Sequence, residues 1–406
     1  MLPKLSRVPL VLLAGLALAA CQDPSGVGLS LIDDEASDPN SRLIATDSLY
    51  VTEQSEPTGG FADGSGTPTQ TRILLGAFTD GLLGDVRATA YADARQEVSS
   101  TAFDERTLDQ LQLELVPAEI VGDTLATIPY EIRQVDPVAG RWNPEGLPSD
   151  TTLATGALLT SGSFSAQDTL VTISLPQSYV DANAEVFTDS LDTQFEGFEL
   201  RVPMGVTPGA VVAFNAALSN IVLITDEYED GDEMTRDTLR YSFVEVYTSL
   251  ERGEPTEVAD RFLLRDGTSD RLNVRFDLDD LTNTPIANGG LRLPLDRAVL
   301  ESGGMFYRPL LSEVALVAIY EDDTRELLLA QAIPEEGDLI LRNSVLTTRL
   351  QSLLLGQIDI VAFEIAPPST PLGLGVLPIL VEEEATPSPD NPRRPRLSLV
   401  TVGSPA

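Results

Sequence analysis

Few residue types in this chain of 406 residues could carry out chemistry. Histidine is absent, cysteine occurs once, at Cys21, and the only lysine is Lys4. Without histidine, His-activated nucleophiles, histidine bases and histidine metal ligands are excluded. A single cysteine excludes an intrachain disulfide and a thiolate zinc site. Carboxylates remain, either as catalytic groups of the glycosidase kind or as oxygen ligands for a cation. We therefore expect the chain not to be an enzyme.

One aromatic residue stands where a ligand could stack on it. Trp142 is the only tryptophan, and the Gly and Pro around it in residues 140–144 predict a loop. An exposed tryptophan beside Arg141 would suit a sugar ring, so Trp142 and Arg141 are the candidate ligand-binding residues. The alternative is that Trp142 plugs one end of a β-sandwich, because tryptophan is mostly buried in proteins.

An acidic loop offers oxygen ligands for calcium. Asp226, Asp230 and Asp232 lie within a run that partly matches the spacing of a calcium-binding loop. Tyr228 and Asp237 depart from that pattern at two ligand positions. The alternative is a hairpin tip whose carboxylates are simply solvated. Apart from this calcium ion, the sequence predicts no cofactor.

Further carboxylates lie at residues 276–281 and 321–323, where they fit solvent-facing strand or turn positions. A pair of acids at the separation that a glycosidase needs could lie anywhere among the 63 Asp and Glu residues. Spacing along the chain does not identify such a pair. A carboxylate-only glycan hydrolase therefore stays open as an alternative function.

The overall charge limits the partners that the chain could have. The chain has 26 Lys and Arg residues against 63 Asp and Glu residues, a formal net charge of −37. This charge excludes non-specific binding to nucleic acid or anionic lipid. An acidic excess almost without lysine also indicates halophilic adaptation, because salt screens the repulsion between carboxylates. The alternative is an ordinary acidic secreted protein.

The N-terminus carries a targeting signal. A basic start precedes an apolar run at residues 8–18, too short to span a bilayer, and small residues follow just before Cys21. This pattern resembles the lipobox of bacterial lipoproteins, which implies a signal peptide at residues 1–20 and acylation of Cys21. Gln22 after the cysteine, in place of Asp, then implies the outer membrane, and Gln22-Asp23 resembles the export tags of surface-exposed Bacteroidota lipoproteins. The alternative is an ordinary secretory signal.

Two segments resemble an uncharacterised family of Bacteroidota lipoproteins of unknown function. One is Cys21-Gln22-Asp23-Pro24-Ser25-Gly26-Val27-Gly28, and the other is the run at residues 72–84 with its Leu-Leu-Gly and later Asp and Gly. Gly81 departs from the proline that is usual in the family. The resemblance implies location and fold, and the family has no activity to carry over.

Hydrophobic periodicity predicts an all-β fold. Residues 21–70 are rich in Asp, Gly, Ser and Pro and indicate a stalk, with one strand at residues 48–53. Beyond residue 70, short runs alternate apolar and polar side chains with a period of two, and turn residues separate them. Such runs are typical of a β-sandwich. The first half is similar to the jelly-roll modules of bacterial surface proteins, many of them carbohydrate-binding-like.

The order of predicted elements repeats. Strand 170–175, a helix-like stretch at 179–195 and strand 198–202 correspond to strand 339–342, a helix at 344–355 and strand 358–365. Strands 220–225 and 239–247 then correspond to 375–381 and 396–402. The repeat predicts two sandwiches, at residues 71–250 and 258–403, with one short helix each. One large irregular sandwich is the alternative.

These features together predict a lipid-anchored protein of the outer membrane or cell surface, acting as a non-catalytic binding or adhesion scaffold. The predicted partners are the membrane, through Cys21, and a glycan or an outer-membrane protein, with no nucleic acid. The alternatives are the glycan hydrolase and a structural subunit of an outer-membrane assembly.

Overall fold

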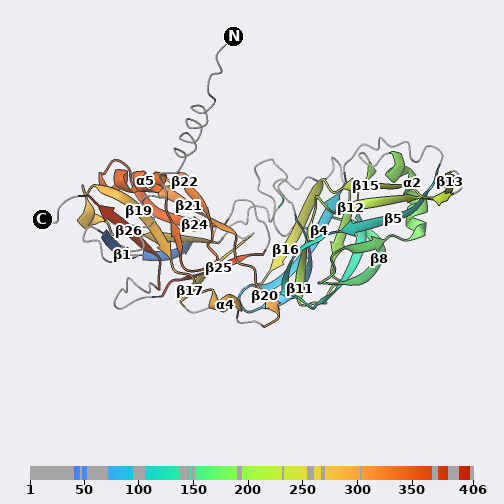
Figure 1. The fold of residues 1–406 in the computed structure, drawn as a ribbon, viewed down its shortest axis with the longest axis horizontal. Coiled ribbons are helices and arrows are strands. Elements are labelled where there is room, and N and C mark those ends of the chain that lie inside the picture. Colours follow the sequence, from blue (N-terminus) through green and yellow to red (C-terminus); the bar gives the residue numbers. More distant parts are fainter. Residues whose placement is uncertain are drawn as a thin grey trace, which may run out of the picture.

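The structure is a computed structural model with two β-rich lobes (Figure 1). It describes residues 41–45, 48–52, 72–94, 106–136, 142, 147, 151–189, 194–230, 233–253, 260–266, 270–301, 304–367, 374–382 and 393–402. The strands form antiparallel sheets, so the all-β fold with β-sandwich modules that the sequence predicts is confirmed. Among the described residues, no helix is both long enough and apolar enough to cross a membrane.

The first sandwich packs a nine-stranded sheet against a four-stranded sheet. The large sheet has the order β20-β6-β11-β3-β4-β10-β7-β8, with β16 also on β4, and the small sheet has the order β15-β12-β5-β9. The strands are β3 (Arg72–Asp80), β4 (Gly84–Asp93), β5 (Leu108–Leu115), β6 (Pro117–Asp123), β7 (Thr127–Val135), β8 (Thr155–Ser165), β9 (Val171–Ser174), β10 (Phe198–Arg201), β11 (Ala210–Asn215), β12 (Asn220–Thr225), β15 (Thr238–Ser242), β16 (Glu245–Arg252) and β20 (Phe306–Tyr307). Helix α2 (Gln177–Asp189) and the hairpin β13 (Tyr228–Asp230) and β14 (Glu233–Thr235) complete this half.

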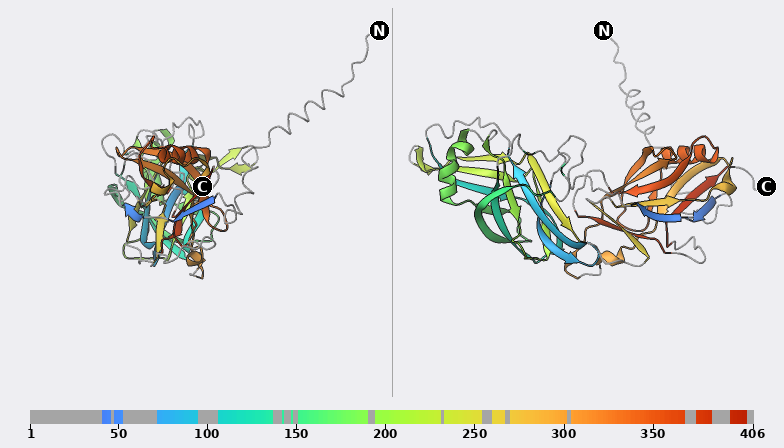
Figure 2. Two further views of the ribbon diagram at one scale, coloured as in Figure 1. Left: turned by 90° about the vertical axis from the view of Figure 1, so that its left-hand side faces the viewer. Right: turned by 180° about the vertical axis from the view of Figure 1, so that it is seen from behind.

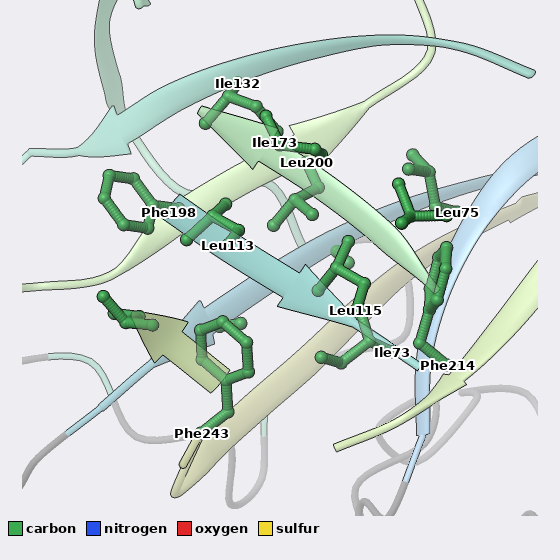
Figure 3. Packing of buried hydrophobic residues seen from close by; sticks show 14 of the residues in the cluster. Ile73, Leu75, Leu113, Leu115, Ile132, Ile173, Phe198, Leu200, Phe214 and Phe243 are labelled. Carbon is green, nitrogen blue, oxygen red and sulfur yellow. The ribbon is translucent and has the colours of Figure 1, made fainter. Parts of the chain in front are cut away.

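Alternation along the strands builds the first core. In β5, Leu111, Leu113 and Leu115 are buried, while the polar residues between them are half-buried. Figure 3 shows Leu113 and Leu115 of the small sheet packed with Phe198 and Leu200 of the large one. The period of two therefore places each apolar set between the sheets, where its burial drives their association.

The second sandwich packs a four-stranded sheet, in the order β1-β26-β19-β23, against a five-stranded sheet, in the order β2-β18-β24-β21-β22. Its strands are β1 (Ser41–Ala45), β2 (Ser48–Thr52), β18 (Arg271–Arg275), β19 (Ile286–Leu293), β21 (Glu313–Tyr320), β22 (Arg325–Ala332), β23 (Leu339–Leu341), β24 (Ile360–Ala366) and β26 (Arg396–Thr401), and a separate ribbon pairs β17 (Arg261–Arg265) with β25 (Val376–Leu380). The helical elements are the 3₁₀ turn η4 (Asp279–Leu281), α4 (Ala298–Glu301) and α5 (Ser344–Leu354).

Helix α5 begins and ends where the sequence predicts. The Asn343 side chain caps its start by accepting a hydrogen bond from the Leu346 amide at 2.6 Å. Leu346, Leu350 and Leu354 form its buried face. Gly356 follows with φ = +63°, a conformation that a residue without a Cβ adopts without strain.

The two sandwiches share most of their topology, although among the described strands the β3–β4 and β6–β11 pairs have no counterpart in the second half. Strands β3 to β12 and β17 to β26 follow each other in the same chain order, with α2 and α5 at the same place. The pairs β3–β11, β4–β10, β7–β10, β7–β8, β5–β9 and β5–β12 correspond to β17–β25, β18–β24, β21–β24, β21–β22, β19–β23 and β19–β26. Glu199 and Glu364, at equivalent places in β10 and β24, are both buried. The fold therefore contains a structural repeat.

The N-terminal strands β1 and β2 are the counterparts of β15 and β16 in this repeat, whereas the predicted repeat matches strand 239–247 to residues 396–402. In the first sandwich β15 pairs with β12 and β16 pairs with β4; in the second, β1 pairs with β26 and β2 pairs with β18. Two residues separate the strands of each pair. Strand β12 thus corresponds to β26, one strand later than the sequence analysis expects. The shift arises because no strand is predicted at residues 210–215, where β11, the counterpart of β25, lies, and because the counterparts of β15 and β16 come from the other end of the chain, inside the predicted stalk.

The sandwiches also meet in a third, smaller core. Leu74, Phe78 and Val211, on the outer face of the large sheet, pack with Leu374 and Val376 of the second half. Strand β20 then joins the edge of β6. The right-hand view of Figure 2, from behind, shows the two lobes meeting at their adjacent ends. The halves are therefore joined by packing and strand pairing as well as by the chain.

Candidate functional site

A groove of about 660 Å³ runs along the edge of β6 and is lined by residues from both halves of the chain. The lining combines charged, polar and aromatic side chains with the edge of the strand itself. The residues that line it are Arg72, Pro117, Ala118, Glu119, Ile120, Thr124, Ala166, Gln167, Asp168, Thr169 and Tyr307. Its volume is within the range of small-ligand sites, roughly 300–1,000 Å³.

The edge of β6 lies open along most of the groove. On one side β6 pairs with β11 from Pro117 to Gly122, whereas on the other side β20 pairs only with Gly122 and Asp123. No other described strand pairs with residues 117–121 on that side. Gly122 has φ = +105°, and an added Cβ would overlap the Gly209 carbonyl, so this position requires glycine.

Two oppositely charged side chains lie on the groove wall. Burial raises the pKa of Glu119, and the charge of Arg72 opposes that shift. The Nη1 atom of Arg72 is buried and has no hydrogen-bond partner in the described part of the chain. Arg72 therefore keeps a hydrogen-bonding capacity that no described residue uses, although Nη1 itself has no exposed surface.

An aromatic side chain closes the groove from the second half of the chain. Tyr307 is 49% exposed and lies opposite Gly122 in the β20–β6 pairing. Its neighbours fix the strand: Phe306 packs edge-on against Phe78 with ring centroids 5.5 Å apart, and Arg308 forms an ion pair with Asp80. Tyr307 is therefore an exposed ring on a rigid support, which suits stacking of a ligand.

The structure places Trp142 away from this groove. Its indole is 4% exposed and packs with Tyr91, Val135 and Tyr247. The Nε1 atom donates a hydrogen bond to the Glu196 carbonyl at 2.6 Å. Trp142 therefore has the buried position that the alternative interpretation describes, and it offers no exposed platform for a sugar. Arg141 lies outside the described residues.

The other predicted site residues are only partly described. Asp226 is half-buried and accepts a hydrogen bond from the Thr107 amide at 3.3 Å. Asp230 ends strand β13, and Asp232 and Cys21 lie outside the described residues. Within the described ranges, no group of three or more Asp, Glu, His or Cys side chains could hold a metal ion. Calcium binding at this loop stays a prediction.

The carboxylates at residues 321–323 line a second cavity, of about 630 Å³. Asp322 accepts hydrogen bonds from Thr324, which lower the pKa of Asp322, so it caps its own turn. The Tyr320 hydroxyl on the wall donates to Glu326. Asp322, Thr324 and Tyr320 of this cavity are therefore engaged in hydrogen bonds with neighbouring groups of the chain.

Sequence reasoning missed the residues of the β6 groove. Arg72, Glu119, Asp168 and Tyr307 are far apart in the sequence, and only Arg72 lies in a segment that the sequence singles out, the run at residues 72–84. The run Phe306-Tyr307-Arg308, two aromatic residues before an arginine, is the one local signal that could have indicated a site.

Comparison with known proteins returns no relative. No protein-family model, no curated protein and no solved structure matches the chain. Functional inference therefore depends on the geometry of the site and on the sequence signals.

Proposed function

We propose that this protein is a lipid-anchored binding protein of the outer membrane or cell surface, and that the β6 groove binds a glycan. The observation that carries this proposal is the groove itself, where the exposed Tyr307 ring and the Arg72 guanidinium line one concave surface. Sugars present flat C–H faces that stack on aromatic rings and hydroxyls that hydrogen-bond to polar side chains. The groove offers both kinds of contact.

Several polar residues in the groove support the binding of a glycan. Thr124, Gln167 and Thr169 supply hydroxyl and amide groups, and the open edge of β6 adds backbone groups. The resemblance of the first half to jelly-roll modules of bacterial surface proteins, many of them carbohydrate-binding-like, also supports a glycan ligand. The site that we propose replaces Trp142 and Arg141 as the glycan-binding position.

Screening the soluble chain on a glycan array tests this function. We expect binding to a restricted set of glycans that falls at least tenfold in Tyr307→Ala and recovers in Tyr307→Trp. Met305→Ala is the matched control, because Met305 is 63% exposed two residues away and does not line the groove. An array without selective binding, or equal binding by Tyr307→Ala, would overturn the proposal.

The proposed lipid anchor is supported by the lipobox-like pattern before Cys21 and by the resemblance to the Bacteroidota lipoprotein family. Several acyl chains on one residue hold a protein stably at a membrane, at ~0.8 kcal/mol per buried CH₂. Metabolic labelling with an alkynyl fatty acid should mark the wild-type protein and not Cys21→Ala. Label that persists in Cys21→Ala would contradict the anchor and leave the glycan site to be judged by the array.

A glycan hydrolase is the second candidate, because two carboxylates share the groove. Burial raises the pKa of Glu119, as a general acid requires, and Asp168 is exposed and lines the same groove. Incubation of each bound glycan with the chain distinguishes the functions. Release of reducing ends that is lost in Glu119→Gln and in Asp168→Asn would favour the hydrolase, and intact glycan would favour the binding protein.

A further inference from the structure

The second sandwich holds a strand pair that comes from a remote part of the chain. Strand β1 covers the edge of β26, and β2 covers the edge of β18. In the first sandwich the same two edges, those of β12 and β4, are covered by β15 and β16, which follow β12 in the sequence. The second sandwich thus receives from residues 41–52 what the first obtains from its own consecutive strands.

The strand pair is held to the second sandwich by antiparallel β pairing along two strand edges. Five residues of β1 pair with residues 396–400, and five residues of β2 pair with residues 271–275. Residues 53–71 then lead to β3, which lies in the other sandwich. The described pairings of β1 and β2 are all with β26 and β18, so the pair is attached to this sandwich as a bound peptide would be.

The charge of the strand pair suits association between copies. Residues 41–52 contain one Arg and one Asp, so the segment is neutral in a chain with a net charge of −37. A neutral donor adds no repulsion of its own to an encounter between two acidic molecules. The remaining repulsion comes from the rest of each chain, and salt screens it.

We propose that the edges of β26 and β18 form an acceptor site for residues 41–52 of a second copy of this chain. Exchange of the strand pair makes the same backbone hydrogen bonds between two copies that form within one copy, so few contacts are lost. Within one copy, a connecting segment holds the pair at an effective concentration on the order of 1 mM. Exchange between copies therefore becomes appreciable only where the concentration of the protein approaches this effective concentration, as for molecules crowded on one surface.

Disulfide trapping in the full chain tests the acceptor site. In a Cys21→Ser background, which removes the only cysteine, one variant carries Ser41→Cys and another carries Val400→Cys. Ser41 and Val400 are partners in the β1–β26 register. The two variants are mixed, unfolded in denaturant, refolded together at about 10 µM and at about 1 mM, and oxidised. A chain carrying both substitutions reports the pairing within one copy.

We expect a covalent heterodimer whose yield rises from about 1% at the lower concentration to tens of per cent at the higher one. Added salt should raise the yield at fixed concentration. The matched control mixes Ser41→Cys with Leu327→Cys, because Leu327 is 61% exposed on β22, at the opposite edge of the five-stranded sheet.

A heterodimer yield that matches the control at both concentrations would overturn the proposal. If the doubly substituted chain forms a cross-linked monomer while the mixed variants give no more heterodimer than the control, the strand pair binds only within its own copy. A yield that ignores concentration would also overturn the proposal, since exchange between copies must follow mass action. The glycan site is tested separately, because Tyr307 takes no part in the β1–β26 pairing.

Discussion

Arg308 and Asp80 form an ion pair across the junction of the two sandwiches, although 228 residues separate them in the sequence. Arg308 Nε lies 3.1 Å from Asp80 Oδ1, and Nη2 lies 2.5 Å from Oδ2. The amides of Leu82 and Leu83 donate to the same carboxylate, each at 3.0 Å. Both charged side chains are less than 10% exposed. The pair fixes β20, and with it Tyr307, against the first sandwich.

Loss of one charge of this pair should destabilise the junction. In Asp80→Asn, Arg308 stays buried without its counter-charge, which typically costs about 3–5 kcal/mol of unfolding free energy. Urea unfolding measured by circular dichroism checks the effect. As a matched control, Glu114→Gln removes the partner of Arg240, which is 52% exposed, and should cost less than about 1 kcal/mol. Equal effects of the two variants would contradict the structural role of Asp80.

The same carboxylate should make stability fall in acid. Burial alone would raise the pKa of Asp80, but hydrogen bonds from Arg308, Leu83 and Leu82 and the Arg308 charge outweigh it and lower the pKa. A lowered folded-state pKa stabilises the fold above the unfolded value of about 3.9, and this is lost as the pH falls through the folded-state value. The difference in unfolding free energy between wild type and Asp80→Asn should thus be full at pH 7 and shrink below pH ~4. A constant difference would contradict this assignment.

Glu119 should have the opposite pH dependence. Burial raises its folded-state pKa, with Arg72 opposing the shift, so its contribution is full below the unfolded value of about 4.3. That contribution is lost as the pH rises through the folded-state value. Glu119→Gln should therefore unfold at higher urea concentration than wild type at pH 7 and at the same concentration near pH 3.5. Reversal of that order would contradict a desolvated carboxylate in the groove.

Trp142 should report on the core of the first sandwich. As the only tryptophan and 4% exposed, it should emit at short wavelength and resist acrylamide quenching until the protein unfolds. Trp142→Ala should lower the unfolding free energy by about 3–5 kcal/mol, because it leaves a large cavity. Trp142→Phe should cost less. A red-shifted, readily quenched emission from the folded protein would contradict the buried position.

Salt should stabilise the folded protein. The net charge of −37 makes the chain repel itself, and salt screens this repulsion. At 1 M ionic strength the Debye length is only about 3 Å, so most of the repulsion is removed. Thermal melts in low and molar salt should show a midpoint that rises with salt. A midpoint that is flat or falls would favour the ordinary acidic protein over halophilic adaptation.

Local sequence patterns predicted many of the strands of this fold and helix α5, but they gave no strand for β8 or β11 and placed the end of α2 at residue 195 instead of Asp189. The period of two in β5 and the spacing of Leu346, Leu350 and Leu354 in α5 reflect which side of a single strand or helix is buried. Asn343 and Gly356 mark the ends of α5 by their own backbone chemistry. Each of these signals involves residues that are close in sequence, so the all-β class and the boundaries of α5 could be derived from the chain alone, whereas α4 and η4 were not predicted.

Pairing between remote segments was decided only in three dimensions. Residues 41–52 carry no local signal for pairing with β26 and β18, because a strand edge can pair with any segment that has a compatible alternation of apolar and polar residues. Tyr307 reaches the groove through β20, which crosses to the other sandwich, and Trp142 is buried because distant strands cover it. A site assembled from Arg72, Glu119, Asp168 and Tyr307 is visible only once the tertiary structure has brought four separate segments to one strand edge.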